Sequence, residues 1–269
     1  KTLQFSVKNT DYSTYYSYDF NSSFWSSQKF QYYDNNGIKS DAFIYVNDTT
    51  KIFIPVIAQS EILIFKGDTL SKKINLNEVN ELVGVKNYNP FFEAYSNIHL
   101  SNNKLYFPVK VFSKLNSGNL DQDKLYAEYN LKTDVINYVG SIPQNFSEHS
   151  TFLLNNFLKS IAVGPKHILV SLPKLPYLIV YDKKGNFVRK LYAQNENIKK
   201  IQKENNQDKT EASILNHISG LYNRVLYDKY RNLYYRISTT YDNYNGTLSG
   251  TLTNNLFKNK ITRVQVINE

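Results

Sequence analysis

The sequence contains neither cysteine nor methionine, and it has a single tryptophan among its 269 residues. Without cysteine the chain can form no disulfide, no thiolate nucleophile and no cysteine-ligated metal site. This absence is compatible with an oxidising compartment. Because the chain begins at Lys1 rather than at a methionine, we expect it to be a processed product.

Long hydrophobic runs are also missing. The most apolar stretch, ILVSLPKLPYLIVY at 168–181, is interrupted by Lys174 and by two prolines. A membrane-spanning helix needs about 20 predominantly apolar residues. We therefore expect no transmembrane segment.

The basic residues do not gather in blocks, although the net charge is +9 and the pI is about 9.3. Lysines occur singly or in pairs, as at 72–73, 183–184 and 199–200. A nucleic-acid-binding protein usually carries a basic stripe or a longer run of like charges. The pattern instead indicates a solvated surface, and nucleic acid is not an expected partner.

Motifs for catalysis or metal binding are absent as well. The four histidines (99, 149, 167 and 217) share no ligand spacing, and there is no GxSxG, P-loop or GxGxxG motif. Trp25 lies in SSFWSSQ and not in a sialidase-type Asp box. We therefore assign no catalytic residue, no metal ligand and no cofactor. A divalent cation held by dispersed Asn, Asp and Glu residues would leave no local motif. A hydrolase or lyase with such a cation in a central channel accordingly stays the alternative to a binding protein.

Aromatic residues are plentiful, with 23 tyrosines and 16 phenylalanines. Aromatic and β-branched side chains favour strands. Four related phrases, each preceded by a polar turn, read as short strands with alternating polarity. They are KIFIPV (51–56), KLYFPV (104–109), HILVSL (167–172) and NLYYRI (232–237).

A second phrase follows three of these strands. In 61–76, 124–140 and 177–192 an apolar strand leads through a turn to a more polar strand. Gly67 and Gly185 are suited to close two of these hairpins with a positive φ, and residues 130–134 close the third. The whole unit recurs about every fifty to sixty-five residues, near the length of a propeller blade. We predict a single all-β domain over 1–269, a β-propeller of six blades, with a β-sandwich as the alternative.

The two chain ends are predicted to complete this architecture. The N-terminal segment 1–48 and the strand ITRVQVIN (261–268) supply the remaining strands, and pairing them in one blade would close the ring. Two polar stretches, 196–219 and 241–255, are expected to be loops, the first with one helix. The Tyr-rich stretches 12–20 and 29–37 suit either blade packing, which we favour, or a sugar or peptide surface.

The segment RVLYDKYRNLYYRIS (224–238) interleaves tyrosines with arginines. We expect two strands joined at DKYRN, with an ion pair between Asp228 and Arg231 across the turn. Leu233, Tyr235 and Ile237 should face one side, and alternate residues the other. The candidate binding residues in and beside this segment are Tyr222, Arg224, Arg231 and Arg236.

The phrase YDKYRNLYYRIS, preceded by SGLYNR, resembles a family of uncharacterised six-bladed propellers from Bacteroidetes, the DUF4221, TolB-like group. The hairpin YLIVYDKKGNFVRKL is similar to a blade hairpin of the same propellers. The resemblance implies an exported protein of the periplasm or outer cell envelope, with a lipid anchor removed together with its leader. It implies no known reaction. We therefore expect a monomeric, non-enzymatic binding or scaffold module for a protein or glycan partner.

Overall fold

The computed structural model describes only part of the chain, and every element with described bounds is a β-strand. The strands before Glu61 are described by their main chain alone. The described residues are 2–8, 12–19, 24–31, 45–48, 51–56, 61–66, 69–76, 88–89, 98–111, 124–141, 159–173, 175–198, 220–241 and 260–268.

The chain divides into two compact units. Unit 1 comprises Lys1–Phe112 and Ala127–Asn137, and unit 2 comprises Ser113–Tyr126 and Tyr138–Glu269. The division runs through a four-stranded sheet of order β13-β12-β10-β9. Its strands are β9 (His99–Ser101), β10 (Lys104–Pro108), β12 (Lys124–Asn130) and β13 (Ile136–Ser141).

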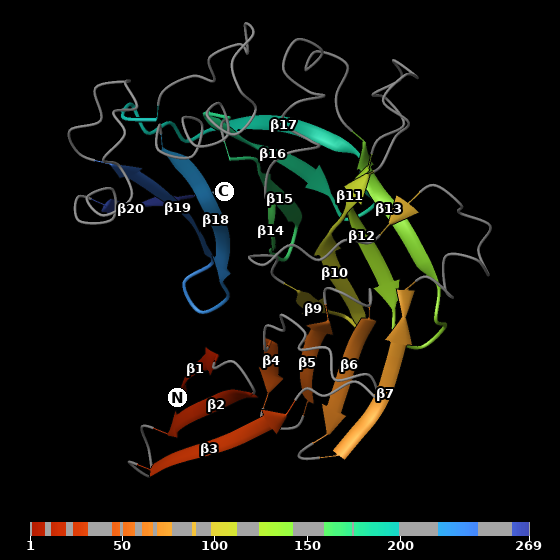
Figure 1. Ribbon diagram of the computed structural model, residues 1–269. Helices are drawn as coiled ribbons and strands as arrows, with labels where there is room; N and C mark the ends of the chain where they lie inside the picture. The colour runs from red at the N-terminus through yellow and green to blue at the C-terminus, as the bar shows by residue number, and fades with distance from the viewer. Residues whose placement is uncertain are drawn as a thin grey trace, which may run out of the picture. The chain divides into compact units, whose positions relative to one another are not determined.

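Unit 1 contains three further antiparallel sheets, two of them built from strands that follow one another in the chain (Figure 1). The first has the order β1-β2-β3, the second β4-β5-β6-β7, and the third pairs β8 with β11. Their bounds are β1 (Thr2–Lys8), β2 (Tyr12–Asp19), β3 (Phe24–Gln31), β4 (Tyr45–Asp48), β5 (Lys51–Val56), β6 (Glu61–Lys66), β7 (Thr69–Asn75), β8 (Tyr88–Asn89) and β11 (Lys110–Val111).

Unit 2 contains a four-stranded meander whose burial falls from its first strand to its last. The order is β14-β15-β16-β17. Every residue of β14 (Ser160–Val163) is buried, and so are most residues of β15 (His167–Ser171) and β16 (Tyr177–Asp182). The residues of β17 (Phe187–Tyr192) are exposed or half-buried. An apolar inner part and a polar outer strand are what the sequence phrases predicted.

Both faces of this meander contact other strand residues of unit 2. On one face, Ala162, Leu169 and Val180 lie opposite one another across three strands and share a core cluster with Val225 and Tyr234. The latter two belong to the sheet of β18 (Leu221–Asp228), β19 (Leu233–Tyr241) and β20 (Lys260–Ile267).

The other face of the meander meets residues of β12 and β13. The Tyr181 hydroxyl donates to the Ser141 carbonyl at 2.9 Å, and its ring lies edge-on to Tyr126 with 5.7 Å between centroids. Antiparallel sheets that bury both faces against their neighbours are blades of a β-propeller. The protein has this fold, while the six-blade count and the single domain stay predictions.

The predicted strands and turns are confirmed where the structure describes them. The four repeated phrases form β5, β10, β15 and β19, and the second phrases form β6–β7, β12–β13 and β16–β17. Asp134 (φ 58°) and Gly185 (φ 86°) adopt the positive φ that their turns require. The loop predictions for 199–219 and 242–255, the hairpin role of Gly67, and the side chains of the Tyr-rich stretches lie outside the described residues.

The predicted union of the chain ends in one blade is wrong for the described strands. β1 pairs with β2 over its full length, and β20 pairs with β19. Each terminal strand therefore belongs to a different sheet. Hairpin neighbours close short loops at low entropic cost, whereas pairing the two ends requires closing the whole chain.

Candidate functional site

The turn between β18 and β19 presents two side chains on an ordered scaffold. One carboxylate oxygen of Asp228 accepts from the Tyr230 amide at 2.8 Å and from the Arg231 amide at 3.2 Å. The other oxygen accepts from the Arg231 guanidinium at 2.7 Å. On the far side of the turn, Asn232 (φ 55°) accepts from the Tyr227 hydroxyl at 2.8 Å. The predicted Asp228–Arg231 pair is confirmed.

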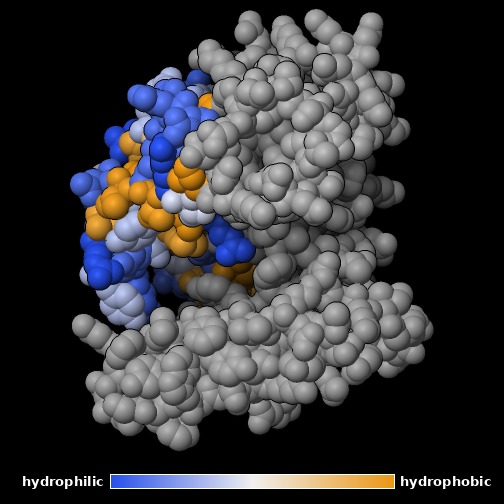
Figure 2. Space-filling view, turned by 60° about the vertical axis from the view of Figure 1, so that its left-hand side comes forward, coloured by the Kyte–Doolittle hydropathy of each residue, from blue (hydrophilic) through white to orange (hydrophobic). Residues whose placement is uncertain are grey.

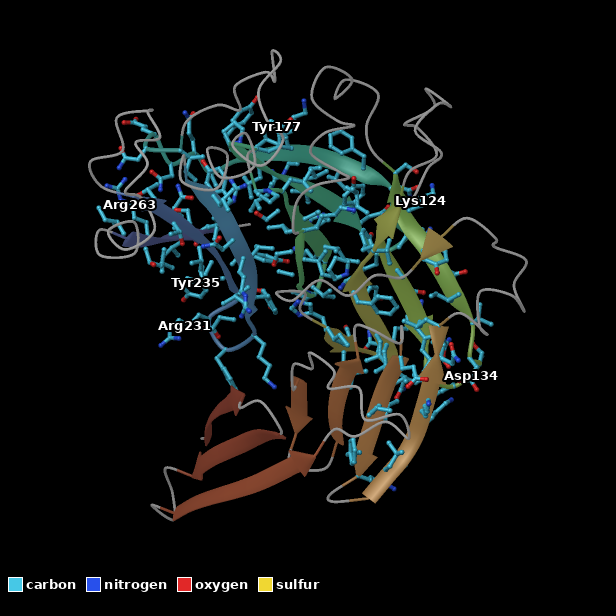
Figure 3. All side chains as sticks on the ribbon, viewed as in Figure 1. Lys124, Asp134, Tyr177, Arg231, Tyr235 and Arg263 are labelled. Carbon is cyan, nitrogen blue, oxygen red and sulfur yellow. The ribbon has the colours of Figure 1, made fainter. Side chains whose placement is uncertain are left out.

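These contacts hold the turn while leaving its tip open to solvent. The Tyr230 residue is 86% exposed and the Arg231 side chain 70% exposed. Arg231 lies at the end of the β18–β19 hairpin, where it is labelled in Figure 3. Because its hydrogen bonds already restrain the turn, a partner would order few additional main-chain torsions on binding.

We expect Asp228→Asn to lower the stability of the protein at neutral pH but not in acid. Hydrogen bonds from Arg231 and the Tyr230 amide hold the pKa of Asp228 below its ordinary value of 3.8. The carboxylate therefore stabilises the fold above about pH 4, and this contribution disappears as the pH falls through the folded-state pKa. Asparagine still accepts the amide bonds but carries no charge.

Thermal unfolding of both proteins between about pH 7 and pH 2 measures this effect. The difference in midpoint should be largest at neutral pH and should shrink in acid. A difference in midpoint that stays constant over the whole pH range would show that the charge of Asp228 does not contribute to stability.

Arg236 is completely buried in unit 2. Its side chain lies in the interior because β19 alternates: residues 234, 236 and 238 are buried, and 233, 235 and 237 are half-buried. Burial away from water lowers the pKa of Arg236 to about 9, so that the guanidinium is still protonated at neutral pH. It donates to Ser171 Oγ (3.2 Å) and to the carbonyls of Leu172 (3.5 Å), Leu175 (2.6 Å), Tyr177 (3.4 Å) and Ala193 (2.9 Å).

Tyr222 covers one face of this guanidinium. The Arg236 Cζ atom lies 3.4 Å from the centroid of the Tyr222 ring, a cation–π contact. The Tyr222 hydroxyl accepts from the Asn195 amide at 2.6 Å, and the Asn195 side chain donates to Ser238 Oγ at 2.9 Å. Arg236 and Tyr222 thus connect β18 and β19 to the β15–β16 connection of the neighbouring meander and to the segment that follows β17.

The four candidate residues therefore occupy three different places. The structure brings Tyr222 and Arg236 together in the interior, and it places Arg231 on the exposed turn. Arg224 is half-buried on β18, beside a register shift between Tyr222 and Arg224. Their role as partner contacts stays a prediction, and Arg231 is the one whose side chain reaches solvent at an ordered turn.

Sequence reasoning missed the charged residues that surround the β18–β19 turn. The Tyr234 hydroxyl donates to the His167 carbonyl at 3.4 Å, which places the β14–β15 turn beside this hairpin. Burial, followed by the positive charges of Arg189 and Lys166, lowers the pKa of His167. The three lysine-bearing turns β14–β15, β16–β17 and β18–β19 are thus neighbours in space. Mapping lysines onto the predicted hairpin turns would have found them.

Unit 1 contains a buried carboxylate with a structural role. Glu128 on β12 pairs with Lys104 of β10 at 2.6 Å. Burial of the ring and the charge and hydrogen bond of Glu128 raise the pKa of Tyr106. Lys104 and Tyr106 of β10 thus satisfy this buried carboxylate.

Among the residues that the structure describes, no group of three or more His, Cys, Asp or Glu side chains is arranged to hold a metal ion. In the same part of the chain, no helix has the length and apolar character needed to cross a membrane.

The family model for a domain of unknown function, DUF4221, matches residues 2–255. The chain belongs to the DUF4221 family. The resemblance drawn from the 219–238 segment is therefore confirmed over nearly the whole sequence. No curated protein matches the chain.

This DUF4221 chain is similar in structure to a solved member of the same family. The crystal structure of a DUF4221 member from Bacteroides vulgatus is 13% identical, with a TM-score of 0.65, and the alignment covers 100% of this chain and 78% of that one. At this identity the likeness shows a shared fold. The WD40 domain of SCAP from fission yeast is 10% identical with a TM-score of 0.37, covering 99% of this chain and 61% of that one.

Proposed function

We propose that this DUF4221 propeller is a non-enzymatic binding module of the cell envelope that holds a partner through its turns. The observation that carries the proposal is the ordered β18–β19 turn, which exposes Tyr230 and Arg231 while Asp228 and Asn232 restrain it. Tyrosine and arginine are enriched among the residues that dominate binding energy at protein interfaces. The export of the protein is part of the proposal, and the lack of cysteine is compatible with it.

Strand β20 supplies further contact area in unit 2. Its Val264 and Val266 are 58% and 60% exposed. Figure 2 shows hydrophobic residues among hydrophilic ones on the side of unit 2 that carries β18 to β20. Mixed surfaces of this kind resemble ordinary protein–protein interfaces, whose cores are apolar and whose rims are polar.

Site-specific photo-crosslinking tests the proposal. A photoreactive aromatic amino acid in place of Tyr230 should give one main protein adduct in cells that express the full chain. The same amino acid in place of Tyr192 is the control, because that side chain is also exposed but lies outside the turn. Excess wild-type protein should suppress the adduct, and excess Arg231→Ser protein should not. Equal adducts from both positions, or none from Tyr230, would contradict binding through this turn.

Two further measurements test the rest of the proposal. The protein should be recovered in the envelope fraction of the cells, and recovery in the cytoplasm would contradict export. Its thermal midpoint should be the same with calcium and with EDTA. A midpoint that EDTA lowers and calcium restores would favour the alternative, a propeller hydrolase or lyase with a bound cation.

A further inference from the structure

Three turns of unit 2 lie at the same end of two neighbouring sheets. In the antiparallel meander, the β14–β15 and β16–β17 turns are at one end, since His167 lies directly opposite Asp182. The β18–β19 turn joins them because Tyr234 contacts His167. A Cβ atom added to Gly164 would lie 3.4 Å from the Tyr227 ring, which confirms how close the β14–β15 turn is to this hairpin.

These turns carry a concentration of positive charge. Residues 164–167, 182–189 and 228–232 contain six lysines and arginines and two aspartates, a net charge of +4. The whole chain of 269 residues carries +9. Seventeen residues thus hold nearly half of the net charge. The exposed cations are Lys166, Lys184, Arg189, Lys229 and Arg231, and we name them the basic turn surface.

The two aspartates of this region act within their own turns. Asp182 accepts from the Lys184 amide at 2.8 Å, from the Asn186 amide at 2.9 Å and from the Asn186 side chain at 2.9 Å. Asp228 binds the amides of its turn and Arg231, as described above. Both carboxylates are therefore engaged in shaping the turns, and the outward-facing charge of the surface is predominantly positive.

An aromatic side chain stands within this charged region. Tyr230 is 86% exposed, and Lys229 Nζ lies 5.3 Å from the centroid of its ring. The cations are divided among three turns and strand β17, so that one compact anion could not contact them all. Successive carboxylates along an extended peptide could do so, with an apolar side chain against the Tyr230 ring.

The geometry points to an acidic protein segment, rich in Asp and Glu, as the partner of the basic turn surface. This inference rests on the proposed binding function and names the chemistry of its partner. Charge complementarity of this kind accelerates encounter and excludes basic competitors. It also makes the affinity depend on salt.

Two variants of equal net charge test this inference. Lys184→Gln with Lys229→Gln removes two charges from the surface. Lys66→Gln with Lys132→Gln removes two from exposed positions at turns of unit 1. The probe is a fluorescent oligo-glutamate peptide, with anisotropy measured against the full chain at low salt. We expect the first variant to weaken binding about tenfold, which corresponds to about 1.4 kcal/mol, and the second less than about twofold. Thermal midpoints of both variants verify that each is folded.

Equal weakening by the two variants would overturn the inference, because binding would then follow net charge alone. The inference would also be overturned if oligo-glutamate did not bind, while vesicles of phosphatidylglycerol or a DNA duplex bound to the wild type and more weakly to the first variant. A Tyr230 crosslink to a protein whose binding is unchanged in the first variant would contradict the acidic partner but leave the proposed function standing. If the photoreactive amino acid at position 230 gives no specific crosslink in the otherwise wild-type protein, both the proposed function and the acidic partner are contradicted.

Discussion

Replacing Arg236 by leucine should destabilise the protein by about 4 kcal/mol, because the substitution leaves several buried acceptors without a donor. Arg236 is 0% exposed and donates to four carbonyls and one hydroxyl. These acceptors lie between the end of β15 and the start of β16 and in the segment after β17. Water cannot reach them in the packed interior, so their desolvation would no longer be compensated. The loss of the stacking contact with Tyr222 adds to the effect.

Urea unfolding of the wild type, Arg236→Leu and Arg236→Lys measures this loss. Lysine keeps the charge but lacks the planar set of five donors, so it should recover only a minor part of the stability. Arg231→Leu is the matched control, since this arginine lies in the same hairpin with an exposed side chain. Its unfolding midpoint should change far less, by the small contribution of the exposed Asp228–Arg231 pair. A small effect of Arg236→Leu would show that the segments around it are held by other contacts.

The same variants separate the structural role of Arg236 from its predicted role in binding. If Arg236→Leu loses partner binding only in proportion to its unfolded fraction, the arginine supports binding through the fold. If the folded variant no longer binds, Arg236 contributes to the partner site itself. Arg231→Ser should lose binding while remaining folded.

Substituting Gly164 by alanine should cost about 3 kcal/mol, because the new methyl group has no room. An added Cβ would lie 1.8 Å from the Tyr234 hydroxyl and 2.6 Å from the ring carbon that bears it. Tyr234 is completely buried and belongs to the core between the two sheets. Its ring cannot move without displacing Leu169, Val225 and their neighbours, since interiors are packed as densely as crystals.

A double-mutant cycle with Tyr234→Leu distinguishes this clash from a change in main-chain freedom. In the Tyr234→Leu background, Gly164→Ala should cost less than about 1 kcal/mol, because the hydroxyl and the ring are gone. Tyr234→Phe should give only partial relief, since the ring carbon remains within 2.6 Å. Equal costs of Gly164→Ala in all three backgrounds would show that steric contact with Tyr234 is not the cause.

Local patterns predicted the strands of this protein well. The phrase HILVSL alternates and follows a turn, and it forms β15 with most of its residues buried. The sequence YDKKGN predicted a hairpin because glycine accepts a positive φ without steric cost, and Gly185 has a φ of 86°. Strand pairing between chain neighbours depends on short segments, so the sequence pattern contains the necessary information. The Asp228–Arg231 pair was predictable for the same reason.

Which side chains become buried was harder to predict. Arginine is seldom found fully inside a protein, so Arg236 was expected to be available to a partner. Its burial depends on carbonyls of residues 172–177 and 193, which are separated from it by 43 to 64 residues of sequence. No pattern near residue 236 encodes those acceptors. Only the packing of β18 and β19 against the preceding meander brings them within reach.

Local sequence patterns are sufficient to predict that the chain is built from antiparallel hairpins in repeated blade units, because alternation and turn chemistry act over a few residues. The sequence also excludes disulfides and thiol chemistry, since no cysteine is present. The places where charge accumulates follow from the packing of the sheets. Lysines that are scattered in the chain, such as Lys166, Lys184 and Lys229, come together because three turns meet at one end of neighbouring sheets. Net charge is a property of composition, whereas a charged surface arises from contacts between residues that are distant in the sequence.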